Sequence, residues 1–189
     1  MAANEVRIIG GMWKGRKLSF PATKHLRPTL GRAREGLFNW LVADIRDARC
    51  LDLFAGSGAL GFEALSRGAA DVTFVEQDRK VARSLRSNVS TLDTSKARVF
   101  AESAERFLRR GEGPWDIVFL DPPFGGDKLP GILREMLRGG ALHSSSIVYF
   151  EHARSEQFTP DQPWSIHREA RAGDTHFGLL QAEPSRLSP

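Results

Sequence analysis

A glycine-rich turn lies between a strand-like apolar segment and a helical pattern near residue 55. Cys50–Phe54 is typical of a short buried strand, and glycines follow it at positions 56, 58 and 61 in the spacing G-x-G-x-x-G. Gly56 permits a tight turn, Gly58 lets a ligand approach the backbone, and Gly61 allows close packing of helix on strand. The motif therefore predicts a parallel βαβ unit whose glycine turn binds a nucleotide-like ligand.

Two acidic residues indicate which ligand this turn prefers. Asp71–Val75 is a predicted strand that ends in Glu76, twenty positions after Gly56, the spacing at which an acid meets ribose hydroxyls. Asp52 lies four positions before Gly56, where its charge would repel a pyrophosphate and attract an ammonium or sulfonium group. S-adenosylmethionine (SAM) carries both of these cations and no phosphate. The pattern favours SAM, and a nicotinamide dinucleotide is the alternative.

A second motif follows the apolar run Ile117–Leu120, namely Asp121-Pro122-Pro123-Phe124. The two prolines lack N–H donors and have a fixed φ, so the turn presents carbonyl oxygens rigidly beside a carboxylate and an aromatic ring. Such acceptors suit a planar group that carries an NH2, such as a nucleobase. An ordinary strand-to-loop turn is the alternative, because Asp and Pro both favour turns. We predict that Asp121, Pro122, Pro123 and Phe124 form the catalytic group, with Asp121 and the Pro122 carbonyl holding the amine and Phe124 stacking on the base.

Strand-like and helix-like segments alternate along the chain, which implies a mainly parallel sheet with right-handed crossovers. The end differs, because Trp164–Arg171 and Thr175–Ala182 are typical of an antiparallel hairpin. We predict an α/β, Rossmann-like class I SAM-dependent methyltransferase fold, with a seven-stranded, mainly parallel sheet, a C-terminal antiparallel hairpin and a small N-terminal β-hairpin arm. Further strands are expected near 50–54, 71–75, 97–100, 115–120 and 146–150, and helices near 29–45, 59–67, 78–92, 103–110 and 129–138.

These elements suggest three segments. Residues 1–28 form a basic arm, residues 29–183 form the methyltransferase domain, and residues 184–189 form a loose tail. The length of 189 residues suits a single compact domain with a sizeable core, and no segment suggests a dimer seam, so we expect a monomer.

Basic residues are concentrated at the N-terminus. Residues 1–34 hold eight Lys or Arg against one acid, whereas the rest of the chain is net negative and the total is +4. This asymmetry predicts an RNA-contacting surface, with a solvated basic terminus as the alternative. Trp13 and Phe20 could either pack inward or stack on bases. The expected RNA-binding residues are Arg7, Lys14, Arg16, Lys17, Arg27, Arg32 and Arg34.

Other residue types exclude several classes of protein. The single cysteine, Cys50, cannot form an internal disulfide, and its place in a buried strand predicts an inert thiol. The five histidines lack metal-ligand spacing, so we expect no metal. No run of eighteen apolar residues and no signal-like segment occurs, so we expect a soluble cytoplasmic protein that binds no membrane.

Motifs along nearly the whole chain, from about Arg7 to Gln181, resemble those of the RsmD family, the bacterial small-subunit ribosomal RNA guanine-N2 methyltransferases. The arm motifs are more specific than the methyltransferase core. The motifs that carry the resemblance are Arg7–Gly11, Lys14–Leu18, Leu26–Thr29, Arg32–Trp40, Asp52–Gly61, Ala64–Ala69, Glu76 and Asp121–Phe124.

The resemblance implies transfer of methyl from SAM to the exocyclic N2 amine of one guanine in 16S rRNA, within a 30S subunit or an assembly intermediate. Where relatives carry Asp or Asn before Ala104, this chain has Glu102-Ser103, which leaves the backbone at Ala104 as an alternative adenine contact. Two alternative functions are an N6-adenine nucleic-acid methyltransferase and a non-catalytic RNA-binding assembly factor. The implied cofactor-binding residues are Asp52, Phe54, Ala55, Gly56, Ser57, Gly58, Glu76, Gln77, Ser103, Ala104 and Asp121.

Overall fold

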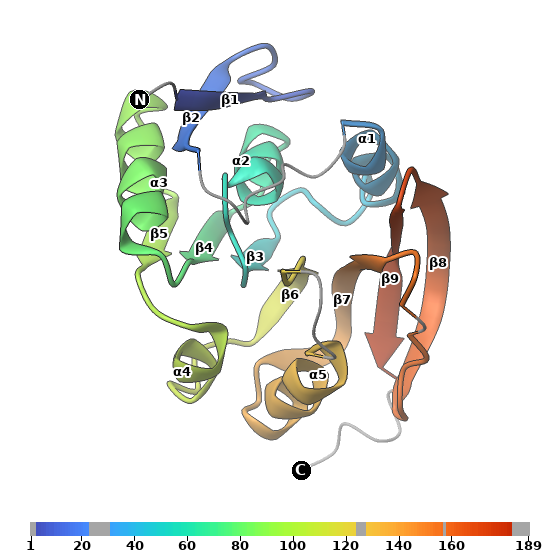
Figure 1. The fold of residues 1–189 in the computed structure, drawn as a ribbon. Helices are drawn as coiled ribbons and strands as arrows, with labels where there is room; N and C mark the ends of the chain where they lie inside the picture. Colours follow the sequence, from blue (N-terminus) through green and yellow to red (C-terminus); the bar gives the residue numbers. More distant parts are fainter. Residues whose placement is uncertain (1–2, 23–30, 124–127, 157, 183–189) are drawn as a thin grey trace.

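A computed structural model describes residues 3–22, 31–123, 128–156 and 158–182 of the chain (Figure 1). The predicted contacts of Arg27 and Phe124 and the predicted tail therefore lie outside the described residues. The strands are β1 (Ala3–Arg7), β2 (Lys17–Pro21), β3 (Arg49–Asp52), β4 (Asp71–Val75), β5 (Ala97–Phe100), β6 (Trp115–Leu120), β7 (Leu142–Ala153), β8 (Trp164–Ala172) and β9 (Thr175–Ala182). The helices are α1 (Gly31–Trp40), α2 (Ala59–Ser66), α3 (Arg79–Thr91), α4 (Ala104–Leu108) and α5 (Leu129–Arg138).

The central sheet has seven strands in the order β5-β4-β3-β6-β7-β9-β8. Strands β5, β4, β3, β6 and β7 pair in parallel, and β9 pairs antiparallel with both β7 and β8. Helices α1, α2 and α3 cover one face, whereas α4 and α5 cover the other (Figure 1). This arrangement confirms the predicted Rossmann-like fold with its antiparallel end and its N-terminal hairpin. In the part of the chain that the structure describes, no helix is both long and apolar enough to cross a membrane.

Two predicted boundaries were wrong by four residues or more. The helix expected over 29–45 ends at Trp40, and residues 41–47 form turns in which Leu41 and Ile45 remain buried. These buried turn residues continue the apolar spacing, which is why the pattern suggested a longer helix. Strand β7 begins at Leu142, earlier than expected, because Leu142 pairs with Trp115 before an irregularity in the ladder. Its first residues are polar and conceal the strand in the sequence.

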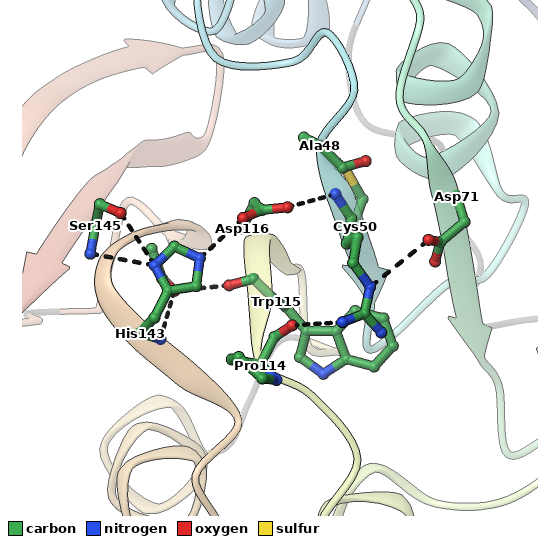
Figure 2. A network of polar contacts seen from close by, with 10 residues as sticks. Ala48, Cys50, Asp71, Pro114, Trp115, Asp116, His143 and Ser145 are labelled. Atoms are coloured by element: carbon green, nitrogen blue, oxygen red, sulfur yellow. Dashed lines mark hydrogen bonds and ion pairs between the residues drawn. The ribbon is translucent and has the colours of Figure 1, made fainter.

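Polar contacts join three strands at the amino edge of the sheet (Figure 2). Asp116 accepts a hydrogen bond from the Arg49 amide at 2.7 Å and contacts Nε2 of His143 at 2.8 Å. The Ser145 amide donates to Nδ1 of His143 at 3.3 Å, so Nδ1 is an acceptor and Nε2 carries the hydrogen that Asp116 receives. These contacts join the starts of β3, β6 and β7, at the edge opposite to the carboxyl ends of the strands.

The N-terminal arm packs against the same core as the sheet. Strands β1 and β2 form an antiparallel hairpin with Ala3 opposite Pro21. Val6, Ile8, Leu18 and Phe20 are buried in the cluster that also contains residues of α2 and α3, and Trp13 packs against it while partly exposed. Phe20 therefore packs inward and does not stack on bases.

Helix α2 provides the polar anchors of the arm. Buried Glu63 accepts hydrogen bonds from the amides of Ile9 and Gly10, both at 2.8 Å. Ser66 Oγ accepts from the Trp13 amide at 2.9 Å and donates to the Gly10 carbonyl. Gly11 has a φ of +75°, and a Cβ there would lie only 1.8 Å from the Ser66 carbonyl oxygen. The Gly10-Gly11 pair thus lets the arm backbone lie directly against the end of α2.

Candidate functional site

Three acidic residues lie together at the carboxyl edge of the sheet. Asp52 ends β3, which lies between β4 and β6, and its register partners are Phe74 and Phe119. Glu76 comes two positions after Phe74, and Asp121 comes two positions after Phe119. The two acids therefore flank Asp52 on either side. The amide of Leu53 also donates to the Phe119 carbonyl at 3.2 Å. The fold therefore brings the glycine turn and the Asp121 motif to one edge, where open α/β sheets bind ligands.

The glycine turn has the geometry that the sequence predicted. Gly58 precedes α2 with a φ of +78°, and a Cβ there would lie 2.6 Å from the Phe62 ring. The Gly56 amide donates to Oε2 of Glu76 at 3.0 Å, and the Asp78 amide donates to Oε1 at 2.7 Å. Glu76 is therefore held directly against the turn by two backbone donors.

Burial gives this edge unusual electrostatics. The pKa of Asp52 is raised to about 7. Burial is the largest cause and the charges of Asp121 and Glu76 add to it, while the hydrogen bond of 3.0 Å from the Gly61 amide to Oδ2 opposes the shift. Burial likewise raises the pKa of Glu76 against the hydrogen bonds from Asp78 and Gly56. A positively charged ligand at this edge would relieve the repulsion among the three carboxylates, so the site fits a cation.

The remaining predicted cofactor residues occupy three places. Phe54, Ala55 and Ser57 form the turn itself, and Gln77 is exposed directly after Glu76. Ser103 caps α4, because its Oγ accepts from the Arg106 amide at 3.3 Å. The preceding Glu102 is committed to ion pairs with Arg106 at 3.1 Å and Arg110 at 2.7 Å. Ala104 is buried in the first turn of α4.

Sequence reasoning missed a buried pair beside Asp121. Leu120 pairs with Phe150, so Asp121, directly after β6, and Glu151, within β7, lie at the same level on adjacent strands. Glu151 is 3 % exposed and accepts a hydrogen bond from the Tyr149 hydroxyl. Burial raises the pKa of Tyr149, and the charges of Glu151 and Asp121 raise it further, which shows that these three groups lie close together. The sequence did contain a signal for Glu151, because this acid directly follows the apolar run 147–150 in the same way as Asp121 follows the apolar run Ile117–Leu120.

The structure separates the predicted RNA-binding residues into two groups. Arg16 donates through Nη2 to the Thr91 carbonyl at 2.8 Å, and Lys17 pairs with Glu5 at 2.6 Å. The others that the structure describes line a cavity of about 510 Å³ between the arm and α1. These lining cations are Arg7, Lys14, Arg32 and Arg34.

Cys50 is fully buried in β3, as predicted, and burial raises the pKa of its thiol well above the usual range, which fits an unreactive side chain. Among the described residues, no group of three or more His, Cys, Asp or Glu side chains is arranged to hold a metal ion.

The chain is similar to known proteins over nearly its whole length. The family model described as Conserved hypothetical protein 95 matches residues 6–181. Ribosomal RNA small subunit methyltransferase D of Escherichia coli (strain K12) is 46% identical over 183 residues, covering 96% of this chain and 92% of that protein. The protein of the same name from Haemophilus influenzae is 40% identical over 184 residues, covering 95% of each. A solved structure of yhhF from Escherichia coli has a TM-score of 0.88 at 44% identity, covering 96% of this chain and 99% of that one.

Proposed function

Because the chain belongs to the ribosomal RNA small subunit methyltransferase D family, we propose that it is a SAM-dependent enzyme that methylates small-subunit ribosomal RNA. The acceptor is the exocyclic N2 amine of a guanine in 16S rRNA, within a 30S subunit or an assembly intermediate, and the enzyme acts as a cytoplasmic monomer. The observation that carries this proposal is the placement of Asp52, Glu76 and Asp121 around the glycine turn at one edge of the sheet.

SAM, when bound, supplies a methyl group on a positively charged sulfur. Glu76, which already lies against the Gly56 amide at 3.0 Å, would accept hydrogen bonds from the ribose hydroxyls. Asp52 and Asp121 would balance the ammonium and sulfonium charges, which fits the raised pKa of Asp52 at about 7. Gly58, whose missing Cβ would collide with Phe62 and Leu85, lets the turn lie close against the core beside the cofactor. Phe54, Ala55, Ser57, Gln77, Ser103 and Ala104 would complete the cofactor contacts.

Asp121 and Pro122 orient the acceptor amine in this proposal. An exocyclic guanine amine is a weak nucleophile because its lone pair is delocalised into the ring. Hydrogen bonds from its N–H groups to the Asp121 carboxylate and the Pro122 carbonyl would hold the nitrogen with its lone pair toward the methyl group. Orientation of this kind can lower a barrier by about 7–11 kcal/mol in the best intramolecular analogues. Phe124 is the proposed stacking partner of the base, and Pro123 stiffens the turn between them.

Glu151 provides a physical reason for guanine over adenine. Guanine has an N1–H donor next to its amine, whereas adenine has a bare N1 acceptor next to its amine. The Glu151 carboxylate lies on the strand beside Asp121, so a base whose amine contacts Asp121 would turn its N1 toward Glu151. A carboxylate accepts from the guanine N1–H and repels the adenine N1 lone pair. The Tyr149 hydroxyl donates to Glu151 and so fixes the carboxylate in place.

The experiment that tests this function is mass mapping of methylated nucleosides in 16S rRNA. Undermethylated 30S particles and naked 16S rRNA are incubated separately with the protein and SAM, and duplex DNA is offered in parallel. We expect N2-methylguanosine at one position of the 16S rRNA. Methylation of adenine N6 would contradict the proposal in favour of the N6-adenine alternative, and RNA binding without methylation would favour a non-catalytic assembly factor.

A further inference from the structure

The cavity between the arm and α1 has a strongly cationic lining. Arg7 and Lys14 come from the arm and Arg32 and Arg34 from α1, and one acid, Glu35, also lines it. Its volume of about 510 Å³ lies within the range of small-ligand sites. The α1 residues lie more than fifteen positions from the arm residues in the sequence, so this concentration of charge is created by the docking of the hairpin.

Arg34 is the least exposed of these cations. Only 4 % of its surface is accessible, and Nη2 donates to the Arg7 carbonyl at 3.0 Å. Its Nε and Nη1 are buried and have no hydrogen-bond partner among the residues that the structure describes. A buried donor left unsatisfied costs about 1–3 kcal/mol, and more when it is charged. Arg34 therefore brings two unsatisfied donors to the wall of the cavity, where an acceptor reaches them once the side chain shifts outward.

The nearest opposite charge is already engaged. Glu63 attracts Arg34 electrostatically, but its carboxylate oxygens accept from the Ile9 and Gly10 amides and from Nε of Arg67 at 2.7 Å. Arg67 repels Arg34, and burial lowers the pKa of the Arg34 guanidinium. An anion in the cavity would satisfy the free Nε and Nη1 donors and offset these unfavourable terms.

We propose that this cavity binds a phosphodiester of the RNA substrate and that Arg34 is its principal ligand. Arginine presents paired donors that match two phosphate oxygens, and Arg7, Lys14 and Arg32 supply further positive charge. The proposal rests on the proposed function, because it takes the RNA substrate from it. It distinguishes the cavity cations from Arg16 and Lys17, whose side chains are already engaged within the arm and α3.

The test compares two double variants that each remove two exposed positive charges. Lys14→Gln/Arg32→Gln alters exposed residues of the cavity, and Arg109→Gln/Arg138→Gln, at the ends of α4 and α5 on the other face of the sheet, is the matched control. Binding of a labelled 16S rRNA fragment is measured by fluorescence anisotropy between 50 and 200 mM KCl. For the cavity variant we expect a salt slope reduced by roughly 0.7–0.9 per lost phosphate contact and an affinity about tenfold lower at a fixed salt concentration. We expect the control to stay within about twofold of the unaltered protein, because its two cations lie on the face of the sheet away from the cavity.

A neutral methylphosphonate introduced at single positions along the RNA locates the phosphate. One position should weaken binding to the unaltered protein and have little effect on the cavity variant. Arg34→Lys, which keeps the charge and loses the paired donors, should weaken RNA binding about fivefold with the melting temperature and SAM affinity unchanged. Arg34→Lys with unaltered RNA affinity would contradict the role of Arg34.

Equal losses in both double variants would overturn the proposal and indicate diffuse attraction. Stabilisation by inorganic phosphate that depends on Arg34, together with unchanged RNA salt slopes, would also overturn it and indicate a site for a free anion. None of these measurements requires methyl transfer. An unaltered protein that binds RNA but leaves it unmethylated would therefore contradict the enzymatic function alone, whereas one that binds no RNA would contradict both.

Discussion

The amide of Gly56 donates a hydrogen bond to Oε2 of Glu76 at 3.0 Å, which joins the turn after β3 to the acid after β4. Oε1 of the same carboxylate accepts from Asp78, so both oxygens face backbone donors beside the proposed ribose position. Glu76→Gln replaces one of these oxygens by an NH2 group. We expect SAM to bind about tenfold more weakly, roughly 1.4 kcal/mol, by isothermal titration calorimetry.

Glu112→Gln is the matched control for this substitution, because Glu112 lies before β6 at the other end of the sheet and pairs with Arg98. Its SAM affinity should be unchanged. A Glu76→Gln variant that binds SAM as tightly as the control would contradict the ribose contact.

SAM binding should release a proton at mildly acidic pH. The pKa of Asp52 is raised to about 7, so at pH 6 the carboxyl is mostly protonated, whereas at pH 8 it is mostly ionised. A bound cation favours the ionised form and lowers this pKa, so binding at pH 6 expels a proton and binding at pH 8 does not. Calorimetry in two buffers of different ionisation enthalpy measures the number of protons released. The same count at both pH values, or an unchanged count in Asp52→Asn, would refute this role.

Asp121→Asn should separate catalysis from cofactor binding. Asparagine has the same size as aspartate, but its neutral amide forms weaker hydrogen bonds to the amine. Its NH2 group can also donate, whereas the carboxylate can only accept. We expect turnover on undermethylated 30S particles to fall by roughly 100-fold or more, because orientation of the amine is lost, while the SAM affinity stays within about threefold. Single-turnover rates and calorimetry supply the two readouts. Near-normal rates in this variant would show that Asp121 does not orient the amine.

Glu151→Gln tests how the base is distinguished. Glutamine can turn its NH2 group toward guanine N1–H, so that two donors face each other. The variant therefore no longer favours a base that carries a hydrogen at N1. We expect kcat/KM on guanine-containing RNA to fall about tenfold, within the usual 1–3 kcal/mol for a hydrogen bond to a buried charged group. RNA carrying 1-methylguanine at the target should be a poor substrate for the unaltered enzyme and should lose little further activity in the variant. An additional loss of the same size in the variant would show that Glu151 does not contact N1.

Gly58→Ala should lower the stability of the folded protein as well as its affinity for SAM. The φ of +78° is strained for alanine, and its Cβ would lie 2.6 Å from Phe62 and 2.7 Å from Leu85. We expect the free energy of unfolding to fall by about 1–3 kcal/mol, measured in urea without cofactor. Gly15→Ala is a useful comparison, because Gly15 also has a positive φ but has no neighbour within 4 Å of the added carbon. Equal losses in the two variants would mean that backbone strain, not crowding, decides the cost.

Local patterns predicted much of the fold. Strand β4 and helix α5 begin and end where alternation and helical spacing placed them, and the parallel order followed from the βαβ rhythm. Glu76 and Asp121 were found because each follows a recognisable strand, and Asp52 was found because it lies four positions before the first glycine of the turn. Contacts between distant segments could not be predicted: Glu63 and Ser66 bind arm residues more than fifty positions away, and Glu151 gains its place only through the pairing of β6 with β7.

The docking of the hairpin on α2 and α3 restricts how RNA binding can be studied. Val6, Ile8, Leu18 and Phe20 fill the interior beneath these helices, and Asn88 of α3 bonds to the Ser19 backbone through both its oxygen and its nitrogen. A chain shortened at its N-terminus would expose this interior and melt at lower temperature, so its failure to bind RNA would report misfolding. Only single-residue replacements that leave the hairpin packed on α2 and α3 can separate a loss of RNA binding from a loss of folding.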